Sequence, residues 1–170
     1  MQKKKWYSWL KEGLKLLVFI LLISTALDWW RKPKEPENFA QQALHTLSQH
    51  DITLAGFSQD HVAVLYFWGS WCGICKHTSP TVEKLRADGI PVLSVALSSG
   101  SDEEVRQYLH QHNLQFDTVN DPQGLLAKQW QIAVTPTIVL LKNGKILHST
   151  SGISSYWGLR TRIGLFNLVY

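Results

Sequence analysis

Cysteine is scarce in this chain: only Cys72 and Cys75 occur among its 170 residues. A structural zinc site usually takes four ligands from paired Cys and His motifs. No second Cys-x-x-Cys and no His-x-x-x-His motif follows the pair at zinc-finger spacing. The sequence therefore argues against a zinc finger and predicts no metal site, although two thiolates alone leave a Cu(I) site open, because soft ligands suit that ion.

Net charge is almost absent outside the N-terminus. The formal charge of +4 arises in residues 1–15, which hold five lysines and one acid and leave 12 of the 17 basic and 12 of the 13 acidic side chains for the rest. A basic tail at one end makes no case for nucleic-acid binding. With 45% hydrophobic and 18% charged residues, and no repeats or low-complexity tracts, the composition indicates a globular protein with an apolar segment attached.

The apolar segment follows the basic tail, and Leu16–Ile23 is its unbroken part. A cleaved signal peptide would explain the small residues Ser24–Ala26. A retained anchor would explain the aromatic residues that flank the segment, since Trp9 and Trp29 are separated by roughly 30 Å of helix. The anchor is the favoured interpretation. In either case everything after Leu27 would be exported, in a bacterium to the periplasm, where disulfide chemistry is expected.

Downstream of a charged linker, apolar patterns predict alternating helices and strands. Helices are expected over 39–48, 72–86, 101–112 and 125–130 and from about 154 onward, the last with Trp157, Ile163 and Phe166 facing inward. Strands are expected over 52–57, 61–68, 90–97 and 116–119, followed by a hairpin that turns at Asn143-Gly144. This order predicts an α/β fold with a mixed sheet and helices on both faces.

The two cysteines fall where a buried strand passes into a helix, within the sequence FWGSWCGICK. A disulfide across so short a loop removes little unfolded-chain entropy, so a purely structural bridge is a weak explanation. Redox chemistry fits better. At a helix N-terminus the thiolate of Cys72 would be stabilised by free backbone N–H groups, and Cys75, three residues on, would reach it as the more buried, resolving thiol.

Two further elements fit a redox site. Trp71 is expected to cover the edge of the site. Thr135-Pro136 stands directly before a strand, and if its peptide bond were cis, the main chain of Thr135 could pair with an extended substrate segment held across the disulfide. An ordinary trans proline at the start of a strand is the alternative.

Together these residues resemble the thioredoxin superfamily over roughly residues 39–170. The basic anchor and exported domain resemble its membrane-tethered TlpA/DsbE-like branch, and the pattern is most similar to the suppressor-of-copper-sensitivity D (ScsD) family of protein disulfide oxidoreductases. The resemblance implies Cys72 as nucleophile, Cys75 as resolving cysteine, Pro136 as a cis-proline beside the disulfide and Trp71 as the aromatic residue before the nucleophile. It also implies a link to copper sensitivity, although no residues of the sequence indicate a copper site.

One position departs from thioredoxin, in which a buried aspartate stands six residues before the first cysteine. Here that position is Tyr66, a poor proton acceptor at neutral pH. Glu83 and His77 are the candidates to take its place, although a solvated helix face is the more ordinary location for both.

The sequence therefore predicts a membrane-anchored periplasmic thiol–disulfide oxidoreductase that needs no cofactor. Its partners would be protein dithiols and disulfides and a redox protein that recycles Cys72–Cys75. Residues 1–30 would form the cytoplasmic tail and transmembrane helix in a bacterial inner membrane, contacting the membrane over 6–30. Residues 31–38 would form a linker and 39–170 the thioredoxin-like domain. The alternative is a Cu(I)-binding copper-tolerance module that uses the same two thiolates.

Overall fold

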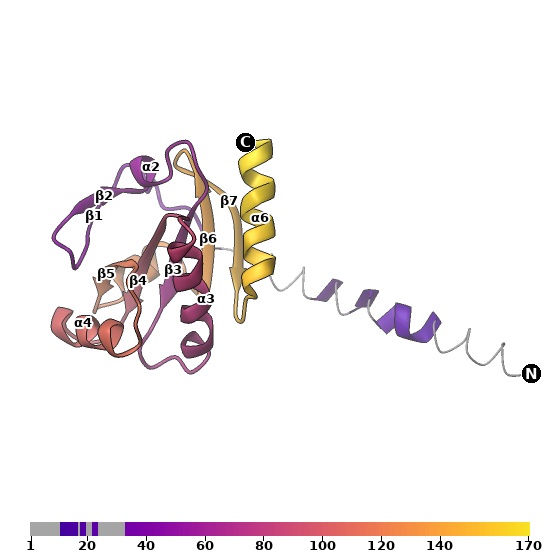
Figure 1. The fold of residues 1–170 in the computed structure, drawn as a ribbon, viewed down its shortest axis with the longest axis horizontal. Helices are drawn as coiled ribbons and strands as arrows, with labels where there is room; N and C mark the ends of the chain where they lie inside the picture. The colour runs from indigo at the N-terminus through magenta and orange to yellow at the C-terminus, as the bar shows by residue number, and fades with distance from the viewer. Residues whose placement is uncertain (1–10, 17, 20–21, 24–32) are drawn as a thin grey trace, which may run out of the picture. The chain divides into compact units, whose positions relative to one another are not determined.

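The computed structural model describes residues 11–16, 18–19, 22–23 and 33–170. The chain forms two compact units, residues 1–32 and residues 33–170. The second unit carries both cysteines and all the strands described below (Figure 1).

The described residues of the first unit are helical, and Lys15 pairs with Glu12 at 2.9 Å on an exposed surface. As an ideal helix, the apolar run 16–23 would be roughly 12 Å long, whereas a membrane span needs about 20 residues. Over residues 11–16, 18–19, 22–23 and 33–170, no helix combines the length and apolarity needed to cross a bilayer. The predicted single-pass location in a bacterial inner membrane is therefore wrong. Trp9, Trp29 and the candidate cleavage sequence 24–26 lie outside the described residues.

The second unit is built on a five-stranded mixed sheet with the order β5-β4-β3-β6-β7 (Figure 1). β3, β4 and β5 are parallel, and β6 is antiparallel to both of its neighbours. Every residue of β3, β4 and β6 is buried, as expected of continuous apolar strands covered on both faces. The strands span β3 Ala63–Trp68, β4 Val92–Leu97, β5 Asp117–Asp121, β6 Thr137–Lys142 and β7 Lys145–Ser151.

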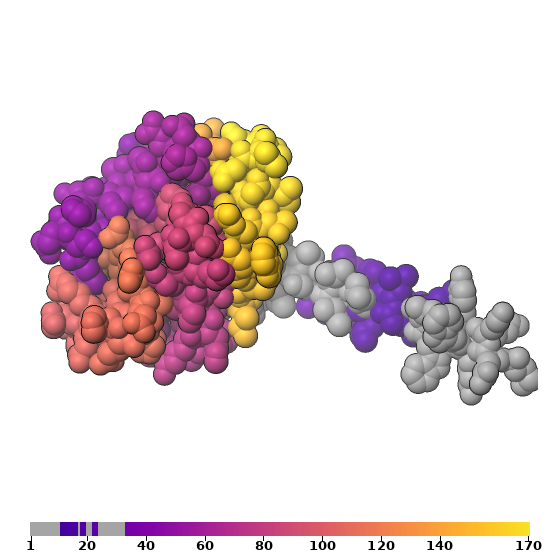
Figure 2. All heavy atoms as spheres, viewed as in Figure 1, coloured from indigo at the N-terminus to yellow at the C-terminus, as the bar shows by residue number. Residues whose placement is uncertain are grey.

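Helices cover both faces of this sheet, which confirms the predicted architecture. One core layer joins Val64, Tyr66 and Trp68 of β3 to three helices: α3 (Cys75–Ala87), α4 (Asp102–Gln111) and α6 (Tyr156–Val169). The opposite layer joins Leu65 and Phe67 to α2 (Leu54–Phe57), to α5 (Leu125–Gln129) and to Phe39 and Leu44, which precede α2. In Figure 2, α6 lies at the surface of this unit, next to the region of α3.

Local signals set several boundaries as predicted. Ser101 and Glu104 form the predicted capping box at the start of α4. Asn143 and Gly144 both have positive φ, 52° and 71°, and form the two-residue turn between β6 and β7.

Two predictions near the start of this unit are wrong. The helix expected over 39–48 is replaced by β1 (Ala43–His45), which pairs antiparallel with β2 (Asp51–Thr53) and buries Leu44 between two exposed neighbours. Nearby, the amide of Leu47 donates to the carbonyl of Thr118 in β5. The strand expected over 52–57 ends early, because the hydroxyl of Thr53 accepts from the amide of Gly56 and caps α2.

One prediction for the last helix also fails. Trp157 was expected to face inward, yet it is 74% exposed. Leu159 and Ile163 are the buried residues of α6, and Phe166 packs against the same core layer. These three recur at a spacing of four and three residues and so share a helix face, which Trp157, two residues before Leu159, cannot join.

Candidate active site

Cys72 lies in the loop that follows β3 and Cys75 is the first residue of α3, and the two form a disulfide with a Cα–Cα distance of 5.2 Å. Cys72 is 6% exposed and Cys75 is 0% exposed. A molecule that arrives from solvent therefore meets Cys72 first. The backbone N–H of Cys75 donates to Sγ of Cys72 at 3.2 Å, so a helix-terminal amide points at the outer sulfur.

The helix begins later than predicted. Its first residue is Cys75 rather than Cys72, because the chain first makes a turn in which the amide of Cys75 bonds to the carbonyl of Cys72. Pro80 lies inside α3 and does not end it, since the helix continues to Ala87. Cys72 thus lies just before the helix rather than within it.

A second segment, distant in sequence, lies against Cys72. The Thr135-Pro136 peptide bond is cis, and the carbonyl oxygen of Thr135 is 3.7 Å from Sγ of Cys72. A sulfur in a disulfide has no hydrogen to donate, so this distance is a contact and not a hydrogen bond. The carbonyl of Pro136 accepts from the amide of Gly152 at 2.8 Å. Three segments therefore meet here: the cysteine loop, the start of β6 and the end of β7.

Sequence reasoning missed the third of these segments. Ile153 follows Gly152 directly and is 75% exposed. A single isoleucine after a glycine carries no pattern, and its place next to Pro136 depends on the pairing of β6 with β7. Trp71 and Ile74, which directly precede Cys72 and Cys75 in sequence, also expose much of their apolar side chains.

Trp71 is held in a definite orientation. Its indole N–H donates to the carbonyl of Leu97, at the end of β4, at 2.9 Å, while 62% of the residue remains exposed. The ring therefore has a fixed orientation, in the residue that directly precedes Cys72.

The inner side of the site contains hydroxyl groups in place of a carboxylate. Tyr66 is fully buried, and its hydroxyl lies 2.9 Å from Oγ of Ser79, one helical turn after Cys75. Burial raises the pKa of Tyr66 above its ordinary value, so the phenol is neutral at physiological pH. Glu83 is engaged elsewhere, accepting from Arg86 at 2.7 Å and from the amide of Gln115 at 2.8 Å.

His77 is exposed on the outer side of α3. Within residues 11–16, 18–19, 22–23 and 33–170, no three His, Cys, Asp or Glu side chains lie close enough together to hold a metal ion. The buried layer that contains Cys75 thus also contains Tyr66, whose hydroxyl bonds to that of Ser79.

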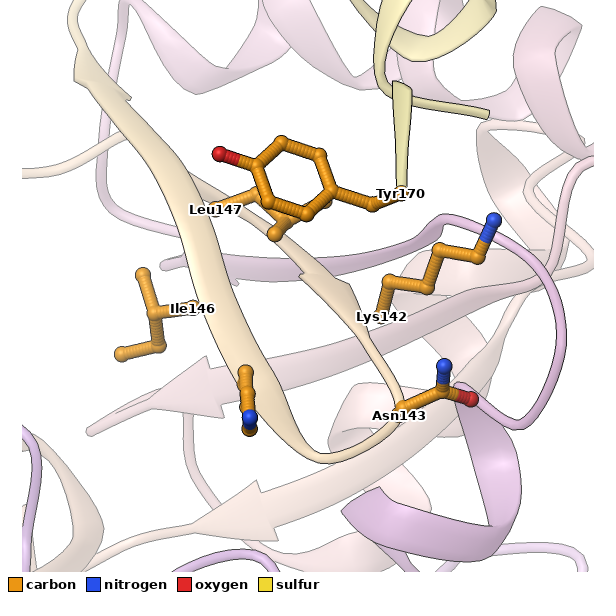
Figure 3. A pocket seen from close by; sticks show the side chains of 6 residues that line it. Lys142, Asn143, Ile146, Leu147 and Tyr170 are labelled. Atoms are coloured by element: carbon orange, nitrogen blue, oxygen red, sulfur yellow. The ribbon is translucent and has the colours of Figure 1, made fainter. Parts of the chain in front are cut away.

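A separate hollow lies at the β6–β7 turn (Figure 3). It is lined by Lys142, Asn143, Lys145, Ile146, Leu147 and Tyr170. Because β6 runs from Thr137, beside Pro136, to Lys142, this hollow lies at the opposite end of the strand from the disulfide. It contains no thiol, and the disulfide end of the sheet is therefore the candidate site.

Comparisons with known proteins find relatives that are thioredoxin-like proteins or thiol-disulfide oxidoreductases. The model of the AhpC/TSA family matches residues 36–149. A thioredoxin-like protein of Haemophilus influenzae is 45% identical over 154 residues, which cover 91% of this chain and 92% of that protein. Sporulation thiol-disulfide oxidoreductase A of Bacillus subtilis is 26% identical and covers 75% of this chain and 82% of its own length. The crystal structure of StoA from Bacillus subtilis superposes with a TM-score of 0.61 at 26% identity, covering 71% of this chain and 93% of that one.

Proposed function

This chain belongs to the AhpC/TSA family and is a thioredoxin-like thiol–disulfide oxidoreductase, and on that premise we propose that it exchanges disulfides with partner proteins through Cys72, with Cys75 as the resolving thiol. The observation that carries this assignment of roles is the difference in access. Cys72 reaches the surface and contacts Thr135, whereas Cys75 is sealed behind it. Only the outer sulfur can meet a sulfur of another protein.

The reaction then has two steps. Starting from the reduced pair, the thiolate of Cys72 attacks a partner disulfide, a mixed disulfide forms and one partner thiolate leaves. Cys75 loses its proton and attacks Sγ of Cys72, which releases the second partner thiolate and closes the Cys72–Cys75 disulfide. Two electrons pass to the partner, and both released thiolates take up protons. The sequence is reversible, and its direction depends on the potential of the partner couple.

The surroundings of Cys72 favour a polypeptide substrate. Trp71 and Ile74, next to the two cysteines in sequence, expose apolar surface, and the carbonyl of Thr135 contacts Sγ of Cys72. An extended chain could bury its apolar side chains on this surface while its backbone N–H groups bond to exposed main-chain acceptors. A small thiol would use little of it. We infer that the substrates are proteins with accessible cysteines, and that a second dithiol protein recycles the pair.

The test is a trapping experiment with the full chain. In Cys75→Ala the mixed disulfide cannot be resolved, so incubation of the reduced variant with insulin should accumulate an adduct through Cys72 that dithiothreitol releases. Cys72→Ala is the matched control and should form no adduct, because its remaining thiol is sealed. Absence of an adduct in Cys75→Ala, or equal adducts in both variants, would contradict the assigned roles.

The same preparation tests the copper-handling alternative that the likeness to ScsD proteins implies. Reduced wild-type protein is titrated with Cu(I) against a chelator and, in parallel, assayed for insulin reduction. Reduction of insulin supports disulfide exchange. Tight uptake of Cu(I) without any exchange would instead favour a binding module built on the two thiolates.

A further inference from the structure

Gly69, the first residue after β3, lies in contact with the ring of Trp71. A Cβ atom at position 69 would lie 2.6 Å from Cε2, 2.7 Å from Nε1 and 3.0 Å from Cζ2 of that indole. Carbon atoms in favourable contact are about 3.5–4.0 Å apart, so no residue with a Cβ fits here unless the indole moves. The ring of Trp71 therefore rests on the bare backbone of Gly69.

The other edge of the indole is fixed by hydrogen bonds at the end of β4. Its N–H donates to the carbonyl of Leu97, which also accepts from the hydroxyl of Ser99 at 3.0 Å. Oγ of Ser99 in turn accepts from the amide of Ser70 at 2.9 Å, which ties the loop between Gly69 and Trp71 to the same strand end. The indole is thus held on two sides, although most of its surface faces solvent.

A large aromatic side chain that is exposed yet already ordered is suited to docking. Ordering a free side chain on binding costs conformational entropy, and this cost is avoided when the side chain is fixed beforehand. Tryptophan is also among the residues that contribute most where proteins dock. Since Trp71 adjoins Cys72, a polypeptide held at the disulfide would meet the indole, whereas a small disulfide would not need it.

We propose that Gly69 is a positioning residue for protein substrates: its missing side chain seats the indole of Trp71 as a preformed docking wall beside Cys72. This inference rests on the proposed disulfide exchange and adds the residue that orders the docking surface. It assigns Gly69 no part in the chemistry of the sulfurs. Gly69 should therefore affect how well a protein substrate binds and leave the reactivity of Cys72 toward small disulfides unchanged.

The test compares two substrates in the full chain. Gly69→Ala should raise the KM for insulin by roughly threefold to tenfold with little change in kcat, because the displaced indole must be ordered on binding. The rate with hydroxyethyl disulfide should stay within about twofold of wild type, the scatter expected for an interaction that contributes nothing. Gly164→Ala on α6, where an added Cβ meets nothing within 4 Å, is the matched control and should leave both reactions unchanged.

A double-mutant cycle separates positioning from a general effect on folding. In the Trp71→Ala background, Gly69→Ala should change the KM for insulin less than about twofold, because there is no indole left to displace. Faster solvent exchange of the Trp71 indole N–H in Gly69→Ala, followed by NMR, would support the loss of the bond to Leu97.

Two results would overturn the proposal: equal losses with both substrates, or the same loss with and without Trp71. Failure of the proposed function itself looks different, because wild-type protein would then exchange disulfides with neither substrate.

Discussion

The hydroxyl oxygen of Tyr66 lies 2.9 Å from Oγ of Ser79, within the buried layer that also contains Cys75. Both groups are removed from solvent, and Ser79 stands one helical turn after the inner cysteine. The buried layer that contains Cys75 therefore holds a pair of neutral hydroxyls that bond to each other.

Removal of one hydroxyl should leave the other without this partner. Tyr66→Phe is expected to lower the free energy of unfolding by about 1 kcal/mol, the usual net contribution of a buried hydrogen bond. Urea denaturation of the oxidised protein at pH 7 measures it. Thr46→Val removes a hydroxyl that donates to the carbonyl of His50 at 3.1 Å and accepts from its amide at 3.2 Å, and so shows what the loss of two such bonds costs away from the site.

The pH dependence of the same variant has a definite sign. Burial raises the pKa of Tyr66 in the folded state, so folding favours the protonated phenol. That contribution is complete below the unfolded-state pKa of about 10 and is lost as the pH rises above it. Wild-type protein should therefore lose stability faster than Tyr66→Phe above about pH 10. Parallel curves for the two proteins would contradict a buried, protonated Tyr66.

The pKa of Glu104 is shifted in the opposite direction from that of Tyr66. Hydrogen bonds from the backbone and then the side chain of Ser101 lower the pKa of Glu104, so the folded state favours the ionised form. The resulting stability is present above the unfolded-state pKa of about 4.3 and is lost as the pH falls through the folded-state value. Glu104→Gln should thus differ from wild type at neutral pH and converge with it in acid. Thermal unfolding between neutral and acid pH checks this, and a difference independent of pH would contradict it.

The carboxylate of Asp121 is buried at the end of β5 and supports the start of α5. Its Oδ1 accepts from the amide of Leu125 at 2.7 Å and its Oδ2 accepts from the amide of Ala127 at 2.9 Å. Asp121→Ala leaves both amides without this partner and should cost about 2–3 kcal/mol of unfolding free energy, as hydrogen bonds to charged groups do. Urea denaturation provides the measurement. Asp117→Ala, at the half-buried start of β5, removes a carboxylate that accepts from the hydroxyl of Ser48 at 3.0 Å rather than from two helix amides, and should cost less.

The parts of the fold that were predictable from sequence are those fixed by local physics. Unbroken apolar runs marked β3, β4 and β6, and Ser101 with Glu104 marked the start of α4. The segment 39–48 was misread because its apolar residues fit a helical spacing, whereas the strand β1 is stabilised by pairing with β2, a contact that depends on the chain's return at residues 51–53. Trp157 was predicted to face inward, but Leu159 and Ile163 form the buried face of α6 and leave Trp157 exposed.

The site divides in the same way. Cys72, Cys75 and Trp71 are neighbours in sequence and could be named from one motif. The contact between Thr135 and Cys72 spans 63 residues, and the sequence offered it only as one of two alternatives. The seat of Trp71 on Gly69 and the place of Ile153 beside Pro136 had no signal in the sequence, because each depends on how side chains and strand ends meet in space.

The turn between β6 and β7 depends on Gly144 both for its backbone conformation and for the space around it. Gly144 has a φ of +71°, which disfavours any residue with a side chain, and a Cβ there would lie 3.0 Å from Cβ of Ala40 and 3.3 Å from Cβ of Ala55. Gly144→Ala should therefore lower the unfolding free energy by about 1–3 kcal/mol. Gly164→Ala, in open space within α6, should raise it by up to about 1 kcal/mol because alanine favours the helix. Urea denaturation of both variants measures these changes, and a Gly144→Ala variant as stable as wild type would show that the turn does not require its glycine.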